Sequence, residues 1–140
     1  MSAEQKKRVH LCLASIALKQ WEKAIASGLV PLSYQETVTG TLQDVEELLP
    51  AEALVCIVEK TDPTSISARF LEPTCASGDE DWHLADEPMY AYLTIYNAFQ
   101  KYALGKDIDD WMIVNQALSS LGTPTDETHS VFEMALNEAA

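Results

Sequence analysis

The sequence is poor in basic residues. It has nine Lys and Arg against 22 Asp and Glu in 140 residues, a formal net charge of −13. Nucleic-acid backbones and anionic lipid surfaces attract positively charged proteins, so this balance argues against direct binding to either. The charge is also uneven, since residues 1–28 carry a net +3 and residues 29–140 a net −16. A basic protein is the natural complement of such a surface.

Cysteine is also scarce, and its spacing is not that of a disulfide framework. The three residues, Cys12, Cys56 and Cys75, are an odd number with no CxxC pair. This usage is typical of a reducing compartment, so we predict a cytoplasmic protein. No apolar run approaches 18 residues, so no membrane span is expected. The basic start at Lys6, Lys7 and Arg8 is interpreted as part of an amphipathic helix rather than a signal peptide.

Catalytic and cofactor motifs are missing. The five glycines form no GxGxxG or GxxxxGK loop, and no serine lies in a GxSxG elbow. The three histidines lie far apart, and the Asp79–His83 group lacks the spacing of a calcium loop or zinc helix. We therefore predict no enzyme activity, no cofactor and no metal. A small enzyme that pairs Cys75 with His83 stays open as an alternative.

Apolar residues recur at helical spacing in segments that glycine and proline separate. Ser2 and Gln5 form a capping-box pattern and Gly28 follows the apolar stripe, which predicts a helix over residues 3–27. Further helices are predicted over residues 33–49, 87–104 and 107–121, the last capped by Asp107, and from residue 123 onward.

Residues 50–73 fit two structures. Pro50 and Pro63 stand where helices begin, with Asp62 as a cap, whereas the run LVCIV is also typical of a buried strand. We favour helices. The predicted fold is an all-α, compact single-domain helical bundle of five to seven helices over residues 1–140. The alternative is an α+β fold with a small hairpin in 50–73.

Acidic residues are densest from Glu72 to Glu87, a stretch without Lys or Arg, and aromatic residues follow it. Tyr90 lies off the apolar stripe of its predicted helix. Tyr and Trp beside carboxylates are typical of a surface that binds a basic protein. A solvated acidic surface and an aromatic core rim are the alternative interpretations. The predicted partner-binding residues are Asp79, Glu80, Asp81, Trp82, Asp86, Glu87, Tyr90, Asp107, Asp109 and Asp110.

One segment, about a quarter of the chain, carries a family resemblance. It has the sequence EPMYAYLTIYNAFQKYALGKDIDDWMIVNQALSSLG and joins an aromatic, alanine-containing helix to an acid-capped helix. This pattern resembles the second half of some helical immunity proteins of bacterial toxin systems. The chain is also similar to them in size and acidity. The resemblance implies tight binding to a cognate toxin, often a cationic nuclease, whose active site acidic groups mask.

These observations predict a cytosolic, non-catalytic inhibitor that binds and neutralises a basic toxin. The main alternative is a phage-type protein that mimics nucleic-acid charge, such as an anti-CRISPR protein, which would displace DNA or RNA from its target. A self-associating scaffold is a further alternative, and the sequence leaves the oligomeric state open.

Overall fold

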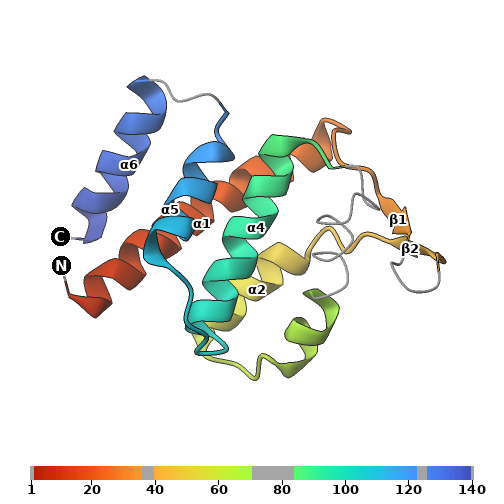
Figure 1. Ribbon diagram of the computed structural model, residues 1–140, viewed down its shortest axis with the longest axis horizontal. Helices are drawn as coiled ribbons and strands as arrows, with labels where there is room; N and C mark the ends of the chain where they lie inside the picture. Colours follow the sequence, from red (N-terminus) through yellow and green to blue (C-terminus); the bar gives the residue numbers. More distant parts are fainter. Residues whose placement is uncertain (1, 36–39, 71–83, 123–125, 140) are drawn as a thin grey trace.

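The structure, a computed structural model, describes residues 2–35, 40–70, 84–122 and 126–139 (Figure 1). Five helices carry labels in Figure 1: α1 (Ala3–Ala26), α2 (Leu49–Glu59), α4 (Asp86–Tyr102), α5 (Asp110–Ser119) and α6 (Asp126–Ala139). Residues 64–70 are also helical. A single hairpin in the described chain joins β1 (Ser33–Gln35) and β2 (Leu42–Asp44). The predicted helical bundle is therefore confirmed.

The first helix begins and ends as its sequence predicts. The Ser2 hydroxyl accepts the Gln5 N–H at 3.1 Å, and Gln5 Oε1 accepts the Ser2 N–H at 2.9 Å. At the other end, Gly28 adopts φ +73°, and the Leu29 N–H donates to the Ala24 carbonyl at 3.0 Å. This is a Schellman termination, in which a left-handed glycine reverses the chain.

Replacing Gly28 by alanine should lower the free energy of unfolding by about 1–2 kcal/mol. Space is not the reason, because a Cβ at this position would meet nothing within 4 Å. The cost is the left-handed backbone, which alanine adopts poorly. Gly28→Asn is the matched control, because asparagine tolerates this conformation better. The midpoint of urea denaturation should be highest for wild type, lower for Gly28→Asn and lowest for Gly28→Ala. Equal midpoints for all three would contradict the assignment.

The predicted helix over residues 33–49 is wrong for most of its length. Residues Ser33–Gln35 pair antiparallel with Leu42–Asp44, with Tyr34 opposite Gln43. The intervening sequence TVTGT is rich in β-branched residues, which lower helix propensity, and Gly40 takes a positive φ of +68°. Tyr34 is buried and anchors the hairpin, whereas Leu42 is exposed and does not join a helix stripe.

The described part of residues 50–73 contains helices and does not contain the hairpin of the alternative prediction. The hairpin that the fold does contain, β1–β2, lies earlier in the chain. Pro50 occupies the first turn of α2. Lys60, whose backbone adopts a left-handed conformation, caps the end of the helix. The Asp62 carboxylate then accepts the Thr64 N–H at 3.0 Å and the Thr64 hydroxyl at 2.7 Å. That cap begins the helix over 64–70, so proline and aspartate act here as the sequence predicts.

The α4 helix lies at the centre of the main core. It packs against α1, α2 and α5 (Figure 1). Large aromatic side chains belong to this core. The Tyr92 ring centroid lies 5.1 Å from that of Trp21 and 5.2 Å from that of Phe70. A second, smaller core contains Val9 and Leu13 of α1, with side chains from α5 and α6. Thus α1 supplies side chains to both cores.

Candidate interaction site

The predicted partner-binding residues fall into three groups along the chain. Asp79, Glu80, Asp81 and Trp82 lie outside the described residues. Asp86, Glu87 and Tyr90 form a group at the beginning of α4, which we call the α4 start. Asp107, Asp109 and Asp110 immediately precede or begin α5. Together with Trp111 and Met112 they form the group that we call the α5 head.

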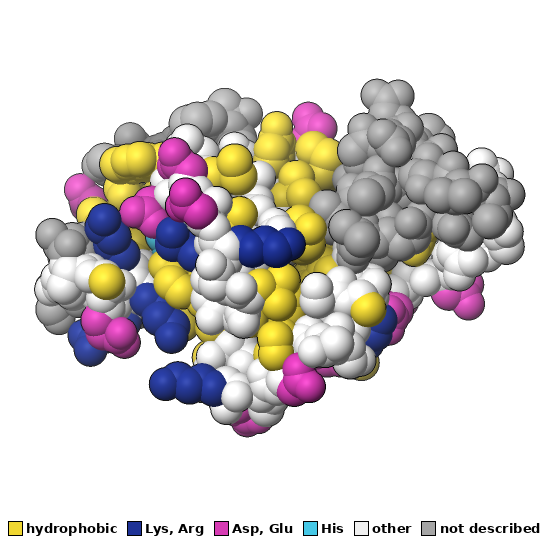
Figure 2. All heavy atoms as spheres, turned by 60° about the horizontal axis from the view of Figure 1, so that its bottom comes forward, with side chains coloured by type: hydrophobic (Ala, Val, Ile, Leu, Met, Phe, Trp, Pro, Cys, Tyr) yellow, Lys and Arg dark blue, Asp and Glu magenta, His cyan; other side chains and the backbone are white. Residues whose placement is uncertain are grey.

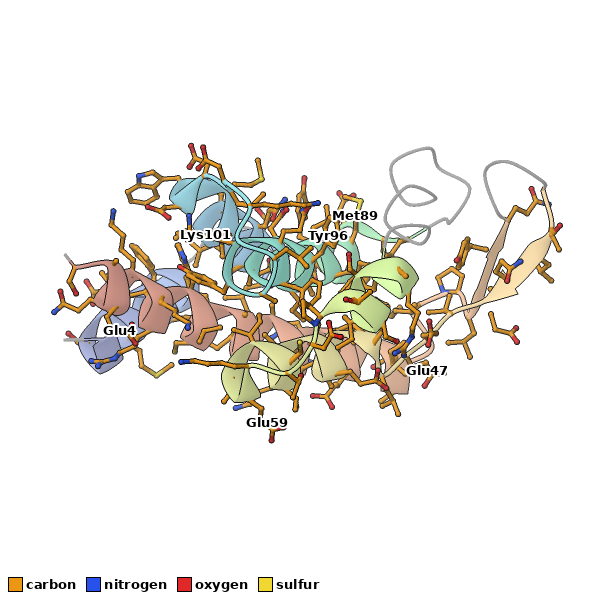
Figure 3. All side chains as sticks on the ribbon, turned by 90° about the horizontal axis from the view of Figure 1, so that it is seen from below. Glu4, Glu47, Glu59, Met89, Tyr96 and Lys101 are labelled. Atoms are coloured by element: carbon orange, nitrogen blue, oxygen red, sulfur yellow. The ribbon has the colours of Figure 1, made fainter. Side chains whose placement is uncertain are left out.

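The α4 start and the α5 head lie at opposite ends of the antiparallel α4–α5 pair. Lys101, near the end of α4, lies 3.2 Å from Asp110. At the far end, a Cβ added to Gly122 would come within 2.8 Å of the Glu87 carboxylate. The 17 residues of α4 span about 25 Å, and Met89 and Lys101 mark its two ends in Figure 3. The described residues therefore form two separate surfaces.

The α4 start has a structural explanation. Asp86 and Glu87 are exposed in the first turn of the helix, where carboxylates interact favourably with the helix dipole. Tyr90 is half-buried, and its carbonyl accepts the Thr94 hydroxyl at 2.7 Å. Stabilisation of the helix accounts for the two carboxylates without a partner protein.

The α5 head exposes large apolar side chains next to carboxylates. Asp109, rather than the predicted Asp107, caps the helix, because its carboxylate accepts the Trp111 N–H at 2.8 Å. The helix therefore starts later than expected, and Trp111 projects from its first turn with 64% of its surface exposed. Met112 is 45% exposed beside it. Asp107 and Asp109 are both exposed.

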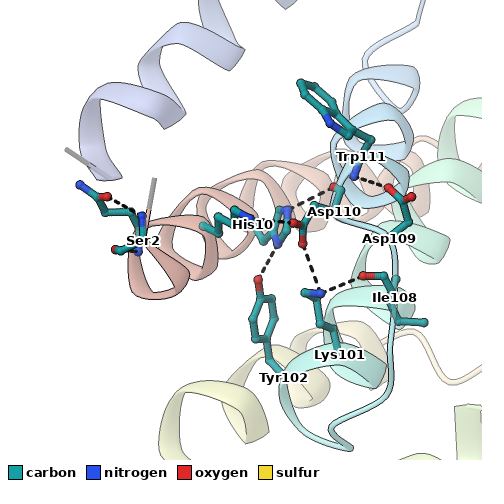
Figure 4. Close-up of polar contacts among 10 residues, drawn as sticks. Ser2, His10, Lys101, Tyr102, Ile108, Asp109, Asp110 and Trp111 are labelled. Atoms are coloured by element: carbon teal, nitrogen blue, oxygen red, sulfur yellow. Dashed lines mark hydrogen bonds and ion pairs between the residues drawn. The ribbon is translucent and has the colours of Figure 1, made fainter.

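Asp110 differs from its two acidic neighbours because lysines from two other helices neutralise it. Its carboxylate lies 3.2 Å from Lys101 Nζ and 3.4 Å from Lys6 Nζ (Figure 4). Partial burial opposes its charge, but the two lysines hold the pKa of Asp110 below its ordinary value. The face drawn in Figure 2 likewise shows basic and acidic side chains intermingled at one end. Asp110 thus serves mainly to hold α5 against α1 and α4.

His10 belongs to the same network, although it is not among the predicted partner-binding residues. The ring is only 2% exposed. Its Nε2 lies 3.2 Å from the Asp110 carbonyl and its Nδ1 2.5 Å from the Tyr102 hydroxyl (Figure 4). Because a carbonyl only accepts, we assign the proton to Nε2, so that Nδ1 accepts the Tyr102 hydroxyl. Burial lowers the pKa of His10 below its ordinary 6.5, although Asp110 opposes this shift.

A groove of about 270 Å³ opens beside the α5 head. Residues of α1 form its floor and residues of α5 and α6 its two walls. Its lining is mainly apolar, with a polar edge where Lys6 meets Asp110. The lining residues are Lys6, Val9, His10, Asp110, Trp111, Val114, Phe132 and Leu136.

Some acidic residues elsewhere are also neutralised internally. Arg69 pairs with Glu46 at 2.7 Å and with Glu52 at 2.8 Å, which ties residues 64–70 to α2 and to the segment after the hairpin. A count of carboxylates therefore overstates the acidic charge that is available to a partner.

No family model, curated protein or solved structure matches this chain. Within the described ranges, no helix is long and apolar enough to cross a bilayer. The same residues contain no group of three or more His, Cys, Asp and Glu side chains arranged to hold a metal ion. Cys75 and His83, the pair of the enzyme alternative, fall outside the described residues.

Proposed function

We propose that this protein is a non-catalytic inhibitor that binds a basic protein partner through the α5 head. The observation that carries the proposal is the exposure of Trp111, 64%, beside the exposed carboxylates of Asp107 and Asp109. Tryptophan is enriched among the residues that dominate binding energy at protein interfaces. Nearby carboxylates would pair with Arg or Lys of the partner and orient its approach.

The overall charge supports the same class of partner. A net charge of −13 attracts a basic protein over a distance of several ångströms and raises its association rate at low salt. Within the α5 head, the available charge is that of Asp107 and Asp109, because Asp110 already pairs with Lys6 and Lys101. We propose a cytoplasmic immunity protein whose partner is a toxin, with the resemblance of residues 87–122 as the basis for this assignment.

The experiment begins with affinity capture from source cells at low salt and identification of a stoichiometric basic protein. Trp111→Ala should then weaken its binding by roughly 30-fold, the equivalent of a hot spot of about 2 kcal/mol. The combined change Asp107→Lys and Asp109→Asn should slow association and reduce its salt dependence. Asparagine at position 109 keeps the helix cap. Both effects would be measured by surface plasmon resonance.

The matched control is Asp86→Lys with Glu87→Gln, which changes the net charge equally at the other end of α4. This variant should retain near wild-type affinity. If it weakened binding while the α5 head variants did not, the proposed surface would be wrong. If the captured complex lost its partner to added DNA or RNA, the nucleic-acid mimic would replace the inhibitor as the better explanation.

A further inference from the structure

The groove beside Trp111 exists because α6 and α5 both pack on α1 without closing against each other along their length. The main partner of α6 is α1. Buried Val9 and Val114 and half-buried Phe132 and Leu136 line the space between the two walls. In the view of Figure 1, α6 stands apart from α5 on one side of the molecule. The groove is therefore an apolar opening beside the smaller core that α1, α5 and α6 share.

The size of the groove suits a single large side chain. An apolar cavity of about 150 Å³ is enough to bind benzene, and this groove has about 270 Å³. It can accommodate an aromatic ring or a branched aliphatic chain and part of the backbone that carries it. Trp111 lies at its edge and is available to cover the inserted group.

The charges around the groove favour a basic flank on the inserted segment. Lys6 and Asp110 satisfy each other at the polar edge, so neither requires a charge from the partner. Asp107 and Asp109 lie in the chain just before this edge and are exposed. The exposed carboxylates of Asp107 and Asp109 therefore carry the charge that favours Lys or Arg on the inserted segment.

We propose that this groove receives one aromatic or aliphatic side chain of the basic partner, on a segment that also carries Lys or Arg. This inference rests on the proposed function and specifies how the partner is recognised. An apolar anchor in a pocket, surrounded by complementary charges, is the arrangement found at the centre of strong interfaces. The anchor would contribute affinity, and Asp107 and Asp109 would contribute orientation and association rate.

The first test uses tryptamine, an indole with a cationic arm, and its anionic counterpart indole-3-acetate. In ¹H–¹⁵N spectra of the full chain, tryptamine should shift signals of groove residues with a Kd on the order of 1 mM. Indole-3-acetate should bind at least fivefold more weakly. Equal binding of the two probes, or tryptamine shifts confined to residues outside the groove, would overturn the inference.

Variants that fill or open the groove provide the second measurement. Leu136→Trp places a ring in it and should weaken tryptamine at least fivefold. Val55→Trp is the matched control, because it adds the same ring on an exposed part of α2 and should change nothing. Phe132→Ala removes part of one wall and should also weaken the probe, which keeps the test decisive if the tryptophan variant does not fold. Unchanged affinity in the folded variants would refute the site.

The captured basic partner separates the two proposals. If it binds Leu136→Trp as tightly as wild type but loses affinity for Trp111→Ala, the groove inference fails and the proposed function stands. If the partner binds Trp111→Ala and the variants at Asp107 and Asp109 as tightly as wild type, the proposed function fails. The groove inference, which rests on that function, then fails too. Loss of affinity in both sets of variants supports both proposals.

Discussion

Replacing Trp21 by alanine should lower the free energy of unfolding by about 3–5 kcal/mol, the range for removing a large aromatic residue from a packed core. The indole is fully buried and contacts Tyr92. Its Nε1–H also donates to the Glu47 carbonyl at 2.9 Å, which links α1 to the segment before α2. The substitution would leave a cavity and a carbonyl without its donor.

Trp111→Ala is the matched control for Trp21→Ala, because it removes the same side chain from an exposed position. Its effect on unfolding should stay within about 0.5 kcal/mol. Urea denaturation followed by circular dichroism would compare both variants with wild type. A large loss for Trp111→Ala would mean that its ring supports the fold, and the proposed interface would lose its main observation.

The second large effect concerns His10 and pH. Folding lowers the pKa of His10, so below about pH 6.5 the unfolded chain takes up a proton that the native protein does not. Stability from this group is therefore present above pH 6.5 and decreases as the pH falls toward the native pKa. One proton limits the slope to about 1.4 kcal/mol per pH unit. Lys6, Lys101, Tyr102 and Asp110 are the ionisable groups that face the ring.

His10→Gln separates this contribution from that of the many carboxylates, which titrate in both proteins. At pH 7.5 the wild type should be more stable by about 1–3 kcal/mol, because glutamine replaces the paired ring imperfectly. As the pH is lowered to 5, the difference should narrow. Urea unfolding at a series of pH values would measure it. A difference that stays constant across this range would show that His10 does not change its protonation in the way proposed.

Local sequence signals predicted most helices because their ends depend on nearby residues. Ser2 with Gln5, Gly28, and Asp62 with Pro63 each act within a few residues, and the structure places them as expected. The hairpin was missed because Val38, Leu42, Val45 and Leu49 have helical spacing, although the TVTGT sequence between the strands opposes a helix. The strands Ser33–Gln35 and Leu42–Asp44 pair despite this helical spacing.

The site was less predictable because it depends on contacts between distant residues. Asp107, Asp109 and Asp110 look equivalent in the sequence, yet only Asp110 meets Lys6, which lies more than 100 positions earlier. His10 pairs with Tyr102 and Asp110 over a similar separation. One local signal was available: a histidine inside the apolar stripe of an amphipathic helix needs polar partners when it is buried.

The attachment of α6 to α1 has a consequence for how the molecule responds to a partner. The large core contains no residue of α6 among its described members, so α6 can open locally while that core persists. A side chain inserted in the groove would touch both α6 and α5 and connect two elements that otherwise meet mainly through α1. Binding and the local order of α6 are then thermodynamically linked, so that occupancy of the groove reduces the opening of the C-terminal helix.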